Sequence, residues 1–125
     1  MITPVELIGF FSQITNWLIS IKNSVRVNRE EYENILTLIY TAANETKHYI
    51  AQQKNGKPRD EEKEMRLSEM WMRAGVKVRR LDFDFGERLL LKADYWANPD
   101  SWTVKQINDA GIELDRVLKN AREIM

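Results

Sequence analysis

The only histidine of the chain belongs to the one residue pair whose spacing is typical of a metal site. Glu45 and His48 have the Glu-x-x-His spacing of helical bundles that hold two metal ions between carboxylates. Such a site needs a second copy of the motif and further inward-facing glutamates, and the sequence has no second histidine. We therefore predict no metal site, and we interpret His48 as a surface residue with an acidic neighbour one helical turn away.

The sequence contains few residues that could form another kind of catalytic site. The absence of cysteine excludes thiolate nucleophiles, and the isolated glycines form no phosphate-binding loop. Paired carboxylates such as Glu61 and Glu64, or Asp82 and Asp84, lie where helices are expected to begin. Acidic side chains there stabilise the positive end of the helix dipole, which explains them without catalysis. We predict that the protein is not an enzyme and has no cofactor.

Four basic residues predict one positively charged helix face. Arg66, Arg73, Lys77 and Arg80 are separated by seven, four and three residues, so they share a side of a helix. Such a face could follow a phosphate backbone, and the nearby Trp71 and Phe83 could stack on bases. Acidic residues between positions 60 and 69 dilute this charge, and basic residues also suit a helix C-terminus. Nucleic-acid binding is therefore the alternative function, and it is not favoured.

The stretch from Trp71 to Trp102 is the most aromatic part of the chain. It holds three of the four tryptophans and two of the four phenylalanines. These side chains either fill the core or anchor a partner protein, because tryptophan, tyrosine and arginine dominate the energetics of interfaces. Phe10 and Trp17 raise the same question, since they lie off the main apolar seam of their helix. The candidate partner-binding residues are Phe10, Trp17, Trp71, Trp96 and Trp102.

Apolar residues recur at alternating gaps of four and three, which predicts long amphipathic helices. The first helix is expected over about residues 4–25, after a Thr3 cap, and the second begins after Asn28 and ends at residues 52–54. Asn55–Arg59 is the strongest loop signal, because it combines glycine and proline. The short connection predicts that the first two helices form an antiparallel hairpin.

The second half of the chain is expected to contain three more helices. Asp60 is the predicted cap of a helix that continues through Gly75 to residue 81. Asp82 or Asp84 begins a short helix that ends at residues 98–100. Asp100 or Ser101 then caps a last helix, whose apolar spacing continues to residue 125. The predicted fold is all-α, an antiparallel helical bundle of four main helices plus one short helix, in a single domain spanning residues 1–125.

The composition of the chain restricts its possible binding partners and its location in the cell. The formal net charge is zero, so the molecule as a whole is not attracted to nucleic acid or to anionic membranes. No run of about 18 apolar residues or signal peptide is evident, so we expect a cytoplasmic protein without a membrane partner. We predict a non-catalytic protein–protein interaction or self-assembly module, which binds another protein or forms a homo-oligomer.

Overall fold

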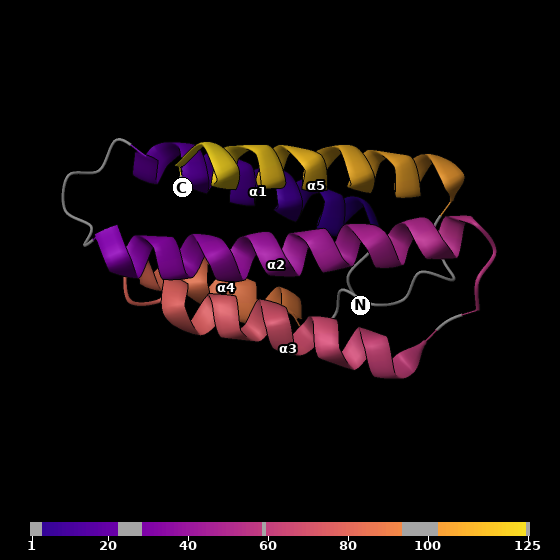
Figure 1. Ribbon diagram of the computed structural model, residues 1–125, viewed down its shortest axis with the longest axis horizontal. Coiled ribbons are helices and arrows are strands. Elements are labelled where there is room, and N and C mark those ends of the chain that lie inside the picture. Colours follow the sequence, from indigo (N-terminus) through magenta and orange to yellow (C-terminus); the bar gives the residue numbers. More distant parts are fainter. Residues whose placement is uncertain (1–3, 23–28, 59, 94–102, 125) are drawn as a thin grey trace.

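The computed structural model describes residues 4–22, 29–58, 60–93 and 103–124, which contain five helices. Figure 1 shows the helices side by side with their long axes roughly aligned. Four of them are long and α4 is short, which confirms the predicted all-α bundle. In chain order they are α1 (Pro4–Lys22), α2 (Arg29–Lys54), α3 (Glu61–Val78), α4 (Phe83–Ala93) and α5 (Val104–Ile124).

The five helices form a closed ring around one apolar core. The last helix, α5, packs against both α1 and α2, while α2 packs against α3 and α3 against α4. Phe85 of α4 closes the ring, because it stacks on two aromatic side chains of α1. Its ring centroid lies 6.1 Å from that of Phe10 and 5.0 Å from that of Trp17.

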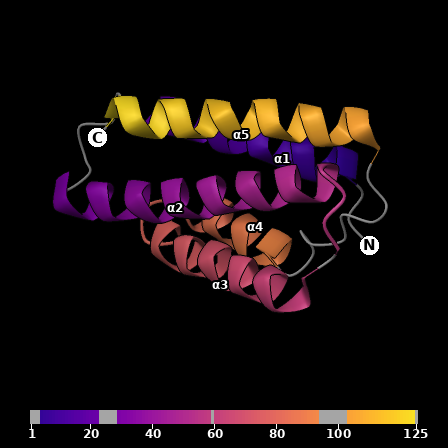
Figure 2. The same ribbon diagram turned by 45° about the vertical axis from the view of Figure 1, so that its right-hand side comes forward.

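Neighbours in the ring are antiparallel except for one pair. Figures 1 and 2 both show α1 and α5 running in the same direction, while α2 runs the opposite way between α5 and α3. A closed ring with an odd number of helices cannot alternate throughout, so one adjacent pair must be parallel. The predicted hairpin of the first two helices needs correction. They do run in opposite directions, but α5 is the main packing partner of each.

The core is built from the predicted apolar seams. Each helix contributes side chains that are less than 2% exposed, and their regular spacing explains why the sequence forms helices here. Burying such side chains is the main favourable contribution to the stability of a domain of this size. The largest of them are Tyr49, Phe11, Ile14, Leu18, Ile35, Leu36, Ile39, Leu67, Leu89 and Leu114.

Side-chain caps define where three helices begin. An Oδ1 atom accepts a 3.0 Å hydrogen bond in two of them, from Lys63 N to Asp60 in α3 and from Phe85 N to Asp82 in α4. The first confirms the predicted cap, and the second decides between the two predicted aspartates. Thr103 caps α5 through reciprocal bonds with Gln106, of 3.1 Å and 2.9 Å. The helix thus begins later than predicted, and Asp100 and Ser101 lie outside the described residues.

Two glycines bring α3 and α4 into close contact. A Cβ atom on Gly86 would lie only 2.5 Å and 2.7 Å from the backbone N and Cα of Arg79. One on Gly75 would lie 3.1 Å from Cγ of Leu90. As predicted, α3 continues through Gly75, but it ends at Val78 rather than at residue 81. These contacts fix the antiparallel register of the α3–α4 pair and leave the opposite side of α3 facing outward.

Candidate interaction surface

The described aromatic candidates for partner binding are inside the bundle. Phe10, Trp17 and Trp71 are only 3%, 7% and 3% exposed. Their side chains are already covered by this chain, so their positions favour a core role over a role as partner anchors. Trp96 and Trp102 lie outside the described residues.

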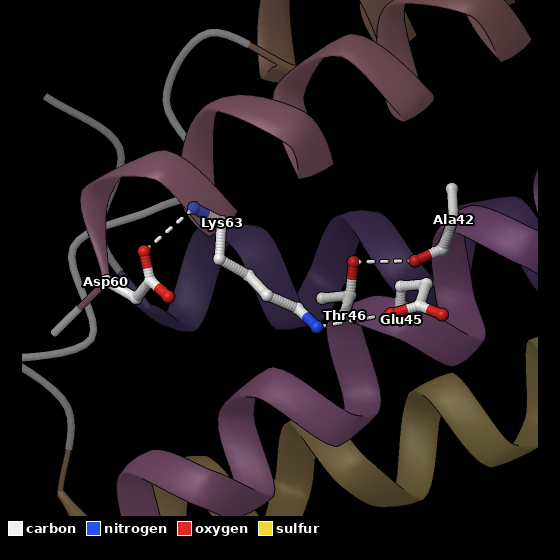
Figure 3. A network of polar contacts seen from close by, with 5 residues as sticks. All are labelled: Ala42, Glu45, Thr46, Asp60 and Lys63. Carbon is white, nitrogen blue, oxygen red and sulfur yellow. Dashed lines mark hydrogen bonds and ion pairs between the residues drawn. The ribbon is translucent and has the colours of Figure 1, made fainter. Parts of the chain in front are cut away.

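Each buried indole also has a hydrogen-bond partner within the bundle. The Nε1 of Trp71 donates to Oγ1 of Thr46 at 2.9 Å, and that hydroxyl donates to the carbonyl oxygen of Ala42 at 2.7 Å. Figure 3 shows Thr46 and Ala42 one helical turn apart on α2. The Nε1 of Trp17 donates to Oδ2 of Asp82 at 3.1 Å. Satisfied N–H groups are what burial of a tryptophan requires, so both residues fit the core.

The residues of the Glu-x-x-His motif lie apart from any metal-binding cluster. His48 is exposed, and a carboxylate oxygen of Glu45 lies 3.4 Å from Nζ of Lys63. Figure 3 shows how Lys63 reaches from the first turn of α3 to α2, while its backbone N–H donates to Asp60. Among the described residues, no group of three or more His, Cys, Asp or Glu side chains is placed to hold a metal ion. Glu45 therefore helps to hold α2 against α3.

Glu64 lies in the first turn of α3, as predicted, but it is also buried and bonded to α2, which the sequence did not predict. Glu64 is 5% exposed, and one of its carboxylate oxygens accepts a 2.5 Å hydrogen bond from the hydroxyl of Tyr49. The same hydroxyl accepts a 3.0 Å bond from the backbone N–H of Asp60. Burial, followed by the hydrogen bond to Glu64, raises the pKa of Tyr49 to about 12. The pair is shielded from solvent and joins the end of α2 to the start of α3.

The predicted basic face of α3 is partly offset by acids from α2. Arg66, Arg73 and Arg80 are exposed and Lys77 is half-buried. Lys77 and Arg80 line a shallow pocket of about 240 Å³ that also contains acidic residues from the first turn of α2. Its lining consists of Glu30, Glu31, Asn34, Lys77 and Arg80. The strongest part of the basic face therefore lies beside negative charge.

A second surface pocket, of about 370 Å³, lies between α2 and α5. Three of its charged side chains, those of Lys47, Asp115 and Arg122, have partners within the chain. The guanidinium of Arg122 donates to the hydroxyl of Tyr40 at 2.7 Å, and Nζ of Lys47 lies 2.5 Å from Oδ1 of Asp115. These contacts hold α5 on α2, and they explain the pocket as part of the packing.

The outer side of α3 carries apolar side chains that the bundle leaves exposed. Met65, Met72 and Val76 are 65%, 46% and 42% exposed. Their separations of seven and four residues place them on one line along the helix, on the side away from Leu67 and Trp71. We call these three residues the α3 stripe. Sequence reasoning missed it because only the inner seam of the helix was considered, although the same spacing rule predicts it.

Charged residues border the α3 stripe along one side. Glu62, Glu69, Arg73 and Arg80 are all exposed. At about 100° per residue, Glu62, Glu69 and Arg73 lie on the same flank of the stripe, within one-third of a turn of it, and Arg80 follows in the turn directly after α3. An apolar centre with a polar rim is the usual composition of a protein interface. The neighbouring helix α4 also has two exposed apolar side chains, Phe83 at 64% and Leu91 at 63%.

No helix in the described part of the chain is long and apolar enough to cross a membrane.

In comparisons with known proteins, no family model, curated protein or solved structure is significantly similar to the chain. The surface of α3 is therefore the feature from which a function can be argued.

Proposed function

We propose that this protein is a non-catalytic protein–protein interaction module and that the outer face of α3 is its binding surface. The observation that carries this proposal is the α3 stripe. Single exposed apolar residues are common on protein surfaces, but an aligned set with helical spacing is typical of a helix that packs on a partner. The proposal keeps the aromatic-rich region as the place of interaction and replaces its buried tryptophans with the exposed Met72 and Val76.

The composition of the stripe suits reversible association. Methionine is unbranched and polarisable, so Met65 and Met72 can adapt to the shape of a partner surface. Removing apolar area from water contributes about 25 cal/mol per Å² before the entropic cost of association is subtracted. The charged flank adds orientation and specificity rather than much affinity, because its side chains remain close to solvent.

The alternative function is nucleic-acid binding through Arg66, Arg73, Lys77 and Arg80. The acidic residues beside Lys77 and Arg80 weaken the field that would attract phosphates. Binding through this face would fall steeply with salt, since each phosphate contact releases counterions. An affinity for duplex or single-stranded nucleic acid with that salt dependence would favour the alternative over the protein-binding proposal.

Site-specific photo-cross-linking tests the proposal. A photoreactive amino acid is placed at position 72 and, as a matched control, at Ile112, which is exposed on α5 at 53%. In cells that naturally produce the chain, we expect protein adducts from position 72 and few from position 112. Equal yields from the two positions, or no protein adduct from position 72, would remove the outer face of α3 as the binding surface.

A further inference from the structure

We propose that the partner of the α3 stripe is a second copy of this chain, with the two α3 helices packed antiparallel about a two-fold axis. This inference rests on the proposed function, because it names the partner of the same surface. It is supported by the distribution of charge along α3. In an antiparallel pair of α3 helices, the acidic half of each helix faces the basic half of the other.

Opposite charges are concentrated in opposite halves of α3 and its flanking residues. Residues 60–71 contain five acidic and two basic side chains, whereas residues 72–81 contain four basic and no acidic ones. In a parallel pair of identical helices, like charges would face each other. In an antiparallel pair, the acidic half of each copy faces the basic half of the other, which is electrostatically complementary.

The flanking residues also agree on one position for the axis. Glu62 and Arg80 lie nine residues before and after Trp71, and Glu69 and Arg73 lie two residues before and after it. A two-fold axis at the level of residue 71 therefore places Glu62 opposite Arg80 of the second copy and Glu69 opposite Arg73 of the second copy. Both pairs select the same register.

The side on which these residues lie is also compatible with the two-fold arrangement. In an antiparallel helix pair related by a two-fold axis, the same flank of each helix faces its own copy. Glu62, Glu69 and Arg73 are on the same flank of the α3 stripe, and Arg80 lies in the turn directly after α3, so the proposed dimer accommodates both ion pairs. Within the described part of the chain, none of the four has an ion-pair partner of its own.

The same axis brings the apolar residues together. Met72 is one residue from the axis, so it meets Met72 of the second copy at the centre of the interface. Met65 lies six residues before Trp71 and Val76 five residues after it, so each lies near the other across the axis. One arrangement of the two copies therefore brings the apolar residues into contact and also pairs the opposite charges. No other partner surface is needed.

The size of this surface predicts a weak dimer. The 18 residues of α3 give a helix about 27 Å long, and one face of such a helix covers less than the roughly 800 Å² per partner of a standard interface. We expect a dissociation constant on the order of 1–100 µM, the range of small reversible interfaces. Salt should weaken the dimer, because its ion pairs remain partly solvated.

A charge-exchange series tests both the partner and the register. Sedimentation equilibrium of the full chain is compared for the wild type, Glu69→Arg, Arg73→Glu and the double variant. Each single change places like charges opposite each other twice in the dimer, so we expect dimer affinity to fall about tenfold. The double variant restores opposite charges at both places, so its affinity should return to within about threefold of the wild type.

Controls separate this effect from a change in the fold. Lys119→Glu, an exposed change on α5, should leave the dimer unchanged, and circular dichroism should show equal helix content for all variants. A monomeric wild type at several hundred micromolar, or a double variant no better than the single ones, would overturn the proposal. A monomeric chain that still cross-links from position 72 to a different protein would overturn self-pairing and leave the proposed function in place.

Discussion

Trp17 and Asp82, which are 65 residues apart in sequence, meet through a 3.1 Å hydrogen bond between the indole Nε1 and the carboxylate Oδ2. The other carboxylate oxygen of Asp82 accepts the backbone N–H of Phe85 and so caps α4. One side chain thus begins the short helix and attaches it to α1. Phe85, in the first turn of α4, then stacks on Trp17, which closes the ring of helices.

Removing the Asp82 carboxylate should destabilise the bundle more than loss of an ordinary helix cap. In Asp82→Ala, loss of the cap costs about 1 kcal/mol, and the mostly buried indole N–H loses its acceptor, which costs about 1–2 kcal/mol more. Urea unfolding should show a total loss of about 2–3 kcal/mol. The matched control is Asp84→Ala, an exposed acid in the same helical turn, which should change stability by less than about 0.5 kcal/mol. Equal effects of the two changes would contradict the bridging role of Asp82.

Alanine at Gly86 should have the opposite effect from alanine at Gly111. The new Cβ of Gly86→Ala would overlap the backbone of Arg79, so α3 and α4 must separate, and we expect a loss of about 2–3 kcal/mol. Gly111 lies within α5, and a Cβ atom there would meet no neighbouring group within 4 Å, so Gly111→Ala should gain about 0.5–1 kcal/mol from helix propensity. Thermal unfolding of both variants measures the difference. A neutral Gly86→Ala would show that the helices do not approach this closely.

Burial of Tyr49, together with its hydrogen bond to Glu64, should make stability depend on alkaline pH. The pKa of Tyr49 is raised to about 12 in the folded chain from an ordinary value of 10.0. Between these values the unfolded chain loses the phenolic proton while the folded chain keeps it, so stability falls as pH rises. The contribution is complete below pH 10 and disappears progressively between about pH 10 and pH 12.

Comparison with Tyr49→Phe isolates this titration from the other groups that ionise at high pH. At pH 8 the variant should be less stable by about 1–3 kcal/mol, because the buried carboxylate of Glu64 loses a hydrogen-bond donor. The stability difference should shrink as pH rises above 10, since only the wild type has the Tyr49 proton to lose. A stability difference that is constant from pH 8 to pH 11 would contradict the raised pKa.

The inner half of each helix was predictable from the sequence, because the spacing of apolar residues is set by helix geometry. The caps at Asp60 and Asp82 followed from the same local chemistry. The start of α5 was misplaced because Thr103 and Gln106 also form a capping box, which competes with the earlier candidates Asp100 and Ser101. Local signals of similar strength were present at both places.

Which side chains lie on the surface was less predictable from the sequence. The main apolar seam of a helix indicates the face that packs on one neighbouring helix, but not the face that packs on a second one. Each helix in a closed ring has two neighbours, so residues off the main seam, such as Phe10 and Trp17, can also be buried. On α1 this second face is covered by Phe85 of α4, a contact that depends on the whole arrangement. The exposed Met72 and Val76 could have been identified from their spacing, but not distinguished from a second buried face.

Disulfide cross-linking at position 72 is the most direct test of an interface on the outer face of α3. The chain contains no cysteine, so Met72→Cys introduces the only thiol, placed beside the proposed two-fold axis. Under mild oxidation we predict a covalent dimer in high yield, and little from Ile112→Cys on α5. Little covalent dimer from Met72→Cys, or the same yield from both variants, would contradict a self-association interface at this face.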